Sequence, residues 1–201
     1  ALNRQGAIVG WQSVAGVENT GRAVIWKDVA RDPSELAVPD GVIGDASASV
    51  VNVDLVVVGK LTWNNGQRSI VAWQVTDVEG VLVANDAIVV ATGTQSGAVS
   101  LNNQGFVAAT LDNRAFRWQV VWNPDLGDSG GLQVTSTEQL FDPHVWSTAA
   151  DINEAGTVCG HFVEGGPQAY AMQLDGTLLE LPPLKVNTRK QESVNVSADA
   201  I

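Results

Sequence analysis

Apolar residues occur along this chain in short runs that are separated by polar turn residues. The clearest runs are rich in β-branched residues and predict strands at residues 55–58, 81–83, 88–91, 106–110 and 194–196. Several runs are apolar at consecutive rather than alternating positions, which indicates strands buried on both faces. The pattern therefore predicts an all-β chain in which small sheets stack against each other.

Signals for helix are sparse. Only residues 136–140 have the composition of a single helical turn, and Pro33 and Pro143 mark loops. The chain has 20 glycines and 7 prolines, and both residue types favour turns.

A short motif recurs four times. It consists of an Asn, two residues, a Gly and an apolar strand, and it begins at Asn3, Asn52, Asn102 and Asn153. These asparagines are 49, 50 and 51 residues apart. A second apolar signal follows each of them and ends at Trp26, Trp73, Trp118 and Met172. A period of this length is typical of propellers, solenoids and other repeat arrays.

The local chemistry of the motif explains its residues. A type I turn favours Asn at its first position and Gly at its fourth, where the backbone needs a positive φ. Asn-x-x-Gly between two apolar segments thus predicts a tight hairpin turn. Leu55 replaces this Gly in the second copy, so we expect that turn to differ from the other three.

About four strands fit in each fifty-residue unit, and a set of such units predicts a β-propeller-like array of four antiparallel sheets. The units span residues 1–50, 51–99, 100–150 and 151–201 of one domain covering residues 1–201. Residues 194–201 occupy the place of the strand that precedes each Asn. We expect this segment to pair with residues 7–11 and close a ring, although the four units could instead belong to a longer open array.

The fourth unit resembles the HAF-type probable extracellular repeat of bacteria. The resemblance rests on five short segments of that unit: Asp151–Gly156, Val158–Gly160, Ala169-Tyr170, Asp175–Leu178 and Leu181–Leu184. The first unit carries it through Ala23–Trp26, and units two and three are degenerate. It implies a secreted or cell-surface, propeller-like module, and it implies no activity. The family commonly has a His before the Ala-aromatic pair, and this chain has Arg22, Ser69, Arg114 and Gln168 there.

Charge and composition exclude some partners. The formal net charge is −11, and nucleic-acid binding requires a basic surface that neutralises phosphates. No apolar run has the length of a membrane span. Cys159 is the only cysteine, and we expect it to be a buried free thiol.

Motifs that suggest catalysis or metal binding are incomplete. Residues 127–131, Gly-Asp-Ser-Gly-Gly, resemble the nucleophile loop of chymotrypsin-like proteases, but His144 and His161 both follow Ser129. Residues 123–128 carry carboxylates without the spacing of a calcium loop. We therefore predict no catalytic residues, no metal site and no cofactor.

Seven tryptophans are the best functional clue. Trp26, Trp73 and Trp118 share one repeat position and are expected in the core. The other four are outside that register and are candidate binding residues, because large aromatic side chains give a large contact area with few rotatable bonds. They are Trp11, Trp63, Trp122 and Trp146.

These observations favour a non-enzymatic interaction or scaffold module that binds a protein or glycan partner. A carbohydrate-active propeller enzyme with acidic residues at a central channel is an alternative, and a purely structural repeat array is another. The fold class alone does not decide among them.

Overall fold

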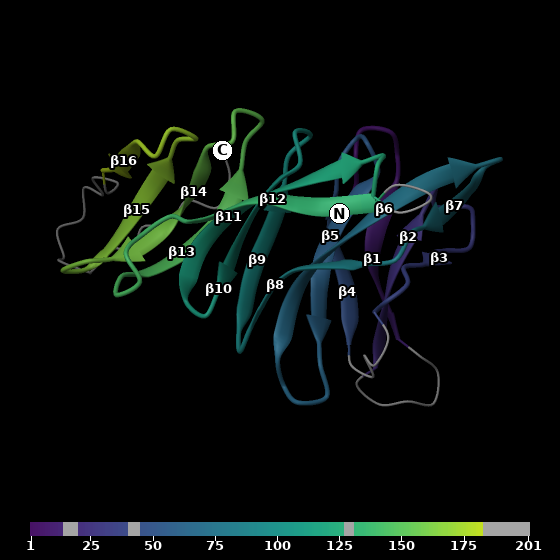
Figure 1. Ribbon diagram of the computed structural model, residues 1–201, viewed down its shortest axis with the longest axis horizontal. Coiled ribbons are helices and arrows are strands. Elements are labelled where there is room, and N and C mark those ends of the chain that lie inside the picture. Colours follow the sequence, from purple (N-terminus) through teal and green to yellow (C-terminus); the bar gives the residue numbers. More distant parts are fainter. Residues whose placement is uncertain (14–19, 40–44, 127–130, 183–201) are drawn as a thin grey trace, which may run out of the picture.

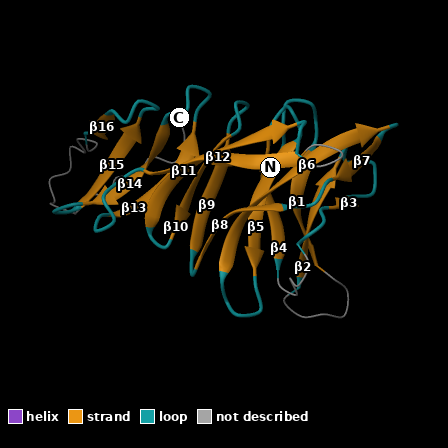
Figure 2. Ribbon diagram, in the orientation of Figure 1, coloured by secondary structure: helices purple, strands orange, loops and turns teal. Residues whose placement is uncertain are grey.

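The computed structural model describes residues 1–13, 20–39, 45–126 and 131–182. In this part of the chain there are sixteen strands and no helix, and the strands form four antiparallel sheets (Figures 1 and 2). The all-β class predicted from the apolar pattern is confirmed. The helical turn predicted at residues 136–140 is wrong, since residues 136–139 belong to a strand that pairs along its whole length.

The sheets succeed one another along the sequence. The first consists of β1 (Ile8–Ser13), β2 (Gly21–Trp26) and β3 (Ser34–Glu35). The second consists of β4 (Ala46–Val51), β5 (Val56–Thr62), β6 (Arg68–Val78), β7 (Val81–Ala84) and β8 (Ile88–Gly93). The third consists of β9 (Ser96–Leu101), β10 (Phe106–Leu111), β11 (Arg114–Asn123) and β12 (Gly131–Gln139). The fourth consists of β13 (Trp146–Ile152), β14 (Val158–Val163), β15 (Pro167–Met172) and β16 (Leu178–Leu181).

The array runs from β3 and β7 at one end of the molecule to β16 at the other (Figure 1). In the second, third and fourth sheets, one strand ends just before the Asn of the motif and the next begins just after it. Among the described residues, no strand precedes Asn3 in the first sheet. Ala1 and Leu2 lie in that place, where Ala1 exchanges two backbone hydrogen bonds with Val9.

The four Asn turns, at residues 3–6, 52–55, 102–105 and 153–156, have the same backbone hydrogen bonds. In each turn the fourth residue donates to the Asn carbonyl, and the Asn N–H donates to the carbonyl of the residue after the turn. The expectation that the second turn differs is wrong. Leu55 adopts a φ of 58°, on the same side of the map as Gly6 at 90°, because the turn and its two strands impose this conformation.

The asparagine side chains also join neighbouring sheets. The Nδ2 atom of Asn3 donates to the carbonyl of Asn52 at 2.8 Å, that of Asn52 to the carbonyl of Asn102 at 3.3 Å, and that of Asn102 to the carbonyl of Asn153 at 2.9 Å. Each Oδ1 accepts backbone N–H groups of its own turn. We call this row of four side chains the Asn ladder.

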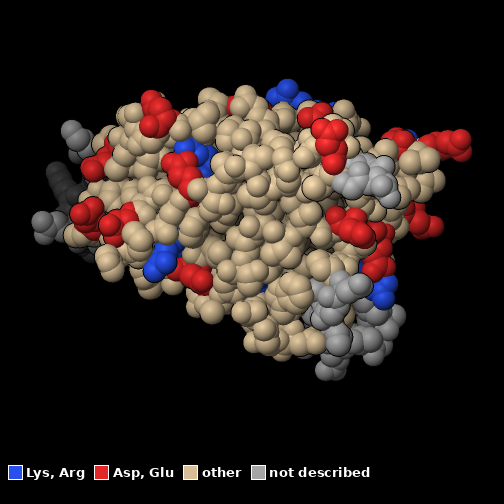
Figure 3. Space-filling model, viewed as in Figure 1, with Lys and Arg blue, Asp and Glu red and all other residues tan. Residues whose placement is uncertain are grey.

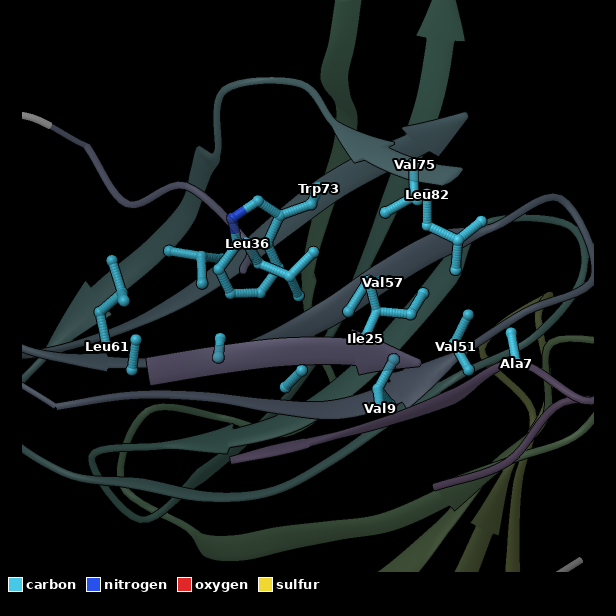
Figure 4. Packing of buried hydrophobic residues seen from close by; sticks show 14 residues of the cluster. Ala7, Val9, Ile25, Leu36, Val51, Val57, Leu61, Trp73, Val75 and Leu82 are labelled. Atoms are coloured by element: carbon cyan, nitrogen blue, oxygen red, sulfur yellow. The ribbon is translucent and has the colours of Figure 1, made fainter. Parts of the chain in front are cut away.

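Three buried clusters fill the spaces between successive sheets. Figure 4 shows the first cluster, where Val9 and Ile25 of the first sheet meet Val57 and Trp73 of the second. Each cluster joins one sheet to the next, so no sheet has a separate core of its own. Nearest-neighbour packing of this kind is the basis of repeat architectures.

The repeat register predicted for three tryptophans is confirmed, and their predicted burial is confirmed in two. Trp73 and Trp118 have 0% and 1% exposure, and both lie opposite a valine five residues after the Asn. Trp26 lies at the same register position opposite Ile8 but is only half-buried.

The predicted ring closure by residues 194–201, like the strand predicted at 194–196, lies outside the described residues. The described part of the chain contains no helix with the length and apolar character of a transmembrane helix.

Candidate ligand-binding site

The four tryptophans outside the repeat register lie at opposite ends of the strands. Trp63 follows the last residue of β5, and Trp146 is the first residue of β13, so both lie away from the Asn turns. Trp11 lies in the half of β1 that is farther from the Asn turn. Trp122 is near the end of β11, which runs back toward the Asn turns. Three of the four are thus at one end of the sheets, on three different sheets, and Trp122 is at the other end.

Two of them have local structural contacts. The Trp63 indole donates to Ser69 Oγ at 2.8 Å, and that hydroxyl is in turn bonded to Thr92. The Trp11 ring covers Gly21, where an added Cβ would lie 1.5 Å from the indole nitrogen. Trp146 has 66% exposure, and no aromatic stacking joins any two of the four in the described chain.

A cavity of about 400 Å³ lies between the second and third sheets. It is formed where the chain passes from β7 to β8 and where β12 begins. Its lining consists of Gln74, Ala84, Asn85, Asp86, Ile88, Leu126, Gly131 and Leu132.

The cavity arises from an irregularity in the second sheet. β6 pairs with β8 as far as Ala72 and with β7 only from Val75. Between the two partners, residues 85–87 are not paired as a strand, and only the Asn85 N–H among them donates to the Gln74 carbonyl, at 2.9 Å. This break leaves space beside the third sheet that a continuous outer strand would fill.

Trp122 is not itself a lining residue of the cavity, but its strand partner Leu132 is. The two residues are direct cross-strand partners, and such partners have their Cβ atoms about 4.5–5.5 Å apart on one face. Trp118 and Val120, on the same face of β11, pack onto the second sheet in the second cluster. Trp122 continues that row beyond the cluster and has 40% exposure.

The polar groups of the cavity have free acceptors. The Gln74 amide nitrogen donates to the carbonyls of Asp54 and Val75 at 2.9 and 3.1 Å. These bonds fix the amide, and its oxygen accepts no hydrogen bond from a described residue. The side chains of Asn85 and Asp86 make no hydrogen bond or ion pair with another described residue. Their donors and acceptors are therefore available to a bound molecule.

The motifs that suggested other chemistry do not form a site in the described part of the chain. Residues 127–130, including Ser129, lie outside it. Asn123 accepts the Asp125 N–H at 3.0 Å, as in an ordinary Asx turn. No group of three or more His, Cys, Asp or Glu residues is placed to hold a metal among the described residues.

The carboxylates with altered pKa values have local explanations. Hydrogen bonding by Lys27 lowers the pKa of Asp77, and backbone and side-chain hydrogen bonds from Thr177 lower the pKa of Asp175. Burial alone would raise the pKa of Asp112, but hydrogen bonds from Thr94 and Gln95 outweigh it and lower that pKa. Each of these lowered pKa values reflects local hydrogen bonds that stabilise the ionised carboxylate, and none prepares an acid for proton transfer.

The sequence reasoning did not identify Arg117, which has 2% exposure. Its guanidinium donates to the carbonyls of Gly156, Gln173 and Leu174 at 2.7, 3.1 and 3.2 Å and pairs with Glu138. It therefore connects the third sheet to two turns of the fourth. A signal was present, because the other three units have Ile25, Ala72 and Ala171 at this position.

Charged side chains are unevenly distributed on the face that Figure 3 shows. They gather toward the two ends of the array, whereas the middle of this face, over β8, β9 and β12, is almost free of charge (Figure 3). On this face, the acidic residues therefore do not gather over the middle sheets.

Comparison with known proteins gave no significant match to a family model, a curated protein or a solved structure. The resemblance to the HAF-type repeat therefore rests on the motif residues alone.

Proposed function

We propose that this protein is a non-enzymatic interaction module that binds a glycan in the cavity beside Trp122. The observation that supports the proposal is the combination of that cavity, its amide and carboxylate groups without partners among the described residues, and an exposed tryptophan paired across the strands with the wall residue Leu132. Ligand sites have volumes of roughly 300–1,000 Å³ and a few placed polar groups among apolar ones. The cavity of about 400 Å³ fits this description.

The chemistry of the lining favours a sugar over an apolar ligand. A sugar ring has a C–H face that packs on an indole, and it has hydroxyl groups around its edge. The Gln74 amide oxygen and the Asp86 carboxylate accept hydrogen bonds from hydroxyl groups, and the Asn85 amide both donates and accepts. Leu126 and Leu132 supply the apolar wall.

Binding is favoured over hydrolysis. Glycoside hydrolysis generally needs two carboxyl groups, one on each side of the scissile bond. Asp86 is the one carboxylate among the lining residues in the described chain. A second candidate, the purely structural array, does not explain why the second sheet leaves polar groups unpaired beside the third.

The propeller-like arrangement is part of the same proposal. Its support is the order of the strands in each sheet, the burial of each sheet against the next and the Asn ladder that joins their turns. A location at the cell surface or outside the cell is proposed from the motif resemblance.

Titration calorimetry with a panel of neutral mono- and disaccharides tests the binding proposal. We expect at least one sugar to bind, and we expect Trp122→Ala to weaken its binding about tenfold or more, as for an aromatic hot spot. Trp146→Ala is the matched control, since Trp146 is exposed on another sheet and at the other end of the strands. Equal loss in both variants, or no heat with any sugar, would reject the site.

A further inference from the structure

The first sheet has one face on which no other sheet packs in the described chain. Side chains alternate along a strand, and Val9 and Ile25 point into the first cluster toward the second sheet. Ile8 and Trp26, which pair with each other, therefore point the opposite way. We call this surface the Trp26 face. It also includes Gly10, Val24, which is buried at 2% exposure, and the exposed ion pair between Arg22 and Glu35.

In the other sheets, this register position always contacts the preceding sheet. Trp73 packs on the first sheet in the first cluster, Trp118 on the second sheet in the second cluster, and Met172 on the third sheet in the third cluster. Trp26 is the equivalent residue of the first sheet but belongs to none of the clusters of described residues. The Trp26 face is thus half of an interface that occurs three times in the chain.

The Asn ladder has the matching asymmetry. Asn3, Asn52 and Asn102 each donate an amide hydrogen to the carbonyl of the next Asn. Asn153 Nδ2 makes no such bond to a described residue, and the Asn3 carbonyl accepts, among these residues, the Gly6 N–H of its own turn alone. One end of the ladder has a spare donor and the other end a spare acceptor.

From these two observations we infer that a second copy of this chain packs head to tail on the first. The fourth sheet of one copy takes the place of the sheet that would precede the Trp26 face of the next. Asn153 of the first copy then donates to the Asn3 carbonyl of the second. Such an interface is heterologous, and it produces either a closed ring or an open filament.

The charge at the Trp26 face permits this association. The face carries one Arg and one Glu that neutralise each other, with 53% and 52% side-chain exposure. The repulsion expected from a net charge of −11 therefore does not act at the centre of the contact.

Sedimentation velocity over a wide range of protein concentration tests the inference. We expect self-association of the wild-type chain and a loss of at least about thirtyfold in affinity with Trp26→Arg or Trp26→Ala, as for a central aromatic anchor. Leu179→Arg, on the face of the fourth sheet opposite its cluster, should also prevent association. Trp122→Arg is the control that should leave association intact, and circular dichroism checks that each variant is folded.

A mixing experiment identifies the geometry. Trp26→Arg retains a functional fourth sheet, and Leu179→Arg retains a functional Trp26 face. A mixture of the two should therefore form a one-to-one dimer, although neither associates alone. A wild-type chain that stays monomeric at all concentrations, or a mixture that does not associate, overturns the head-to-tail inference. Neither result bears on sugar binding at Trp122, which calorimetry measures independently.

Discussion

Single residues of the recurring motif have two separable roles, one in the turn and one in the ladder. Asn52 is buried, its Oδ1 accepts two N–H groups of its own turn, and its Nδ2 donates to the Asn102 carbonyl. An Asp at this position keeps an oxygen that accepts the N–H groups of the turn. Its second oxygen replaces Nδ2, so it faces the Asn102 carbonyl without a hydrogen to donate. The turn and the ladder can thus be tested separately.

We predict that Asn52→Asp destabilises the protein by about 2–4 kcal/mol at neutral pH, because a buried carboxylate loses its partner and faces a carbonyl oxygen. Asn153→Asp is the matched control and should change the stability of the dilute, monomeric chain little, because its Nδ2 has no acceptor among the described residues. Urea unfolding measures both. A similar loss at the two positions would show that the ladder bond contributes nothing.

The glycine that ends the motif is required by the strand beside it. An added Cβ at Gly160 would lie 1.9 Å from the Thr148 carbonyl oxygen, and one at Gly59 would lie 2.0 Å from that of Ser47. Gly10 has the same place in the first copy, where no strand in the described part of the chain precedes the turn, and its added Cβ would meet the Trp26 ring at 3.4 Å.

We therefore predict that Gly160→Ala costs about 2–4 kcal/mol, because the backbone of two paired strands must separate. Gly10→Ala should stay within about 1 kcal/mol of wild type, since a contact at 3.4 Å is ordinary. Thermal unfolding monitored by tryptophan fluorescence compares the two. Equal costs would contradict this explanation of the motif glycine.

At the scale of elements, the third and fourth sheets are joined by a buried charge. Arg117 on β11 donates to three carbonyl groups in turns of the fourth sheet. Truncation would leave these carbonyls without donors inside a contact between sheets. We predict that Arg117→Met costs about 2–4 kcal/mol. Arg114→Met, on the same strand but exposed, should cost less than about 0.5 kcal/mol. Denaturant unfolding midpoints, compared at an unchanged m-value, measure the stability loss of each variant.

The turn that contains Asp112, between β10 and β11, makes the stability of the protein depend on pH. The folded-state pKa of Asp112 is below its usual value of 3.8, as hydrogen bonds from Thr94 and Gln95 favour the ionised form. The contribution of ionised Asp112 to the free energy of unfolding is therefore present above the unfolded-state pKa, and it is lost as the pH falls through the folded-state pKa. Asp112→Asn should lower stability near pH 7, by less than about 1 kcal/mol at this exposed site. The free energies of unfolding of the wild-type and Asp112→Asn proteins should become equal near pH 2, as measured by urea unfolding.

The sequence predicts the elements better than the site. The spacing of the Asn turns and the register of Trp73 and Trp118 follow from local chemistry and periodicity. By contrast, the cavity beside Trp122 depends on where β6 changes partner, and no local pattern contains that information. Leu55 shows the same limit, because the pairing of its neighbouring strands outweighs its own preference for negative φ.

At the scale of the whole molecule, each sheet depends only on its neighbours. In such arrays stability is approximately a sum of unit terms and nearest-neighbour terms. Hydrogen exchange in Gly160→Ala should therefore be faster throughout β13–β16 and nearly unchanged in β1–β3, when measured on dilute, monomeric protein. The opposite outcome, equal loss of protection at both ends, would indicate that the end sheets are coupled in a closed ring.

Deletion of residues 194–201 tests the predicted closure directly. If this segment supplies the missing strand of the first sheet, its loss should increase amide exchange at Ile8 and Val9, because an open edge exposes backbone groups. Protection that stays unchanged in the truncated monomer would contradict the closure.

The Asn ladder has a consequence for how such a chain can vary in length. Each rung uses one side-chain amide of one turn and one backbone carbonyl of the next. Every internal junction therefore offers the same connection, whatever the sequence of the sheets around it. A gene segment that encodes one unit could be duplicated or lost between any two others without leaving a rung unmatched, so the number of units can change in steps while the type of junction stays the same.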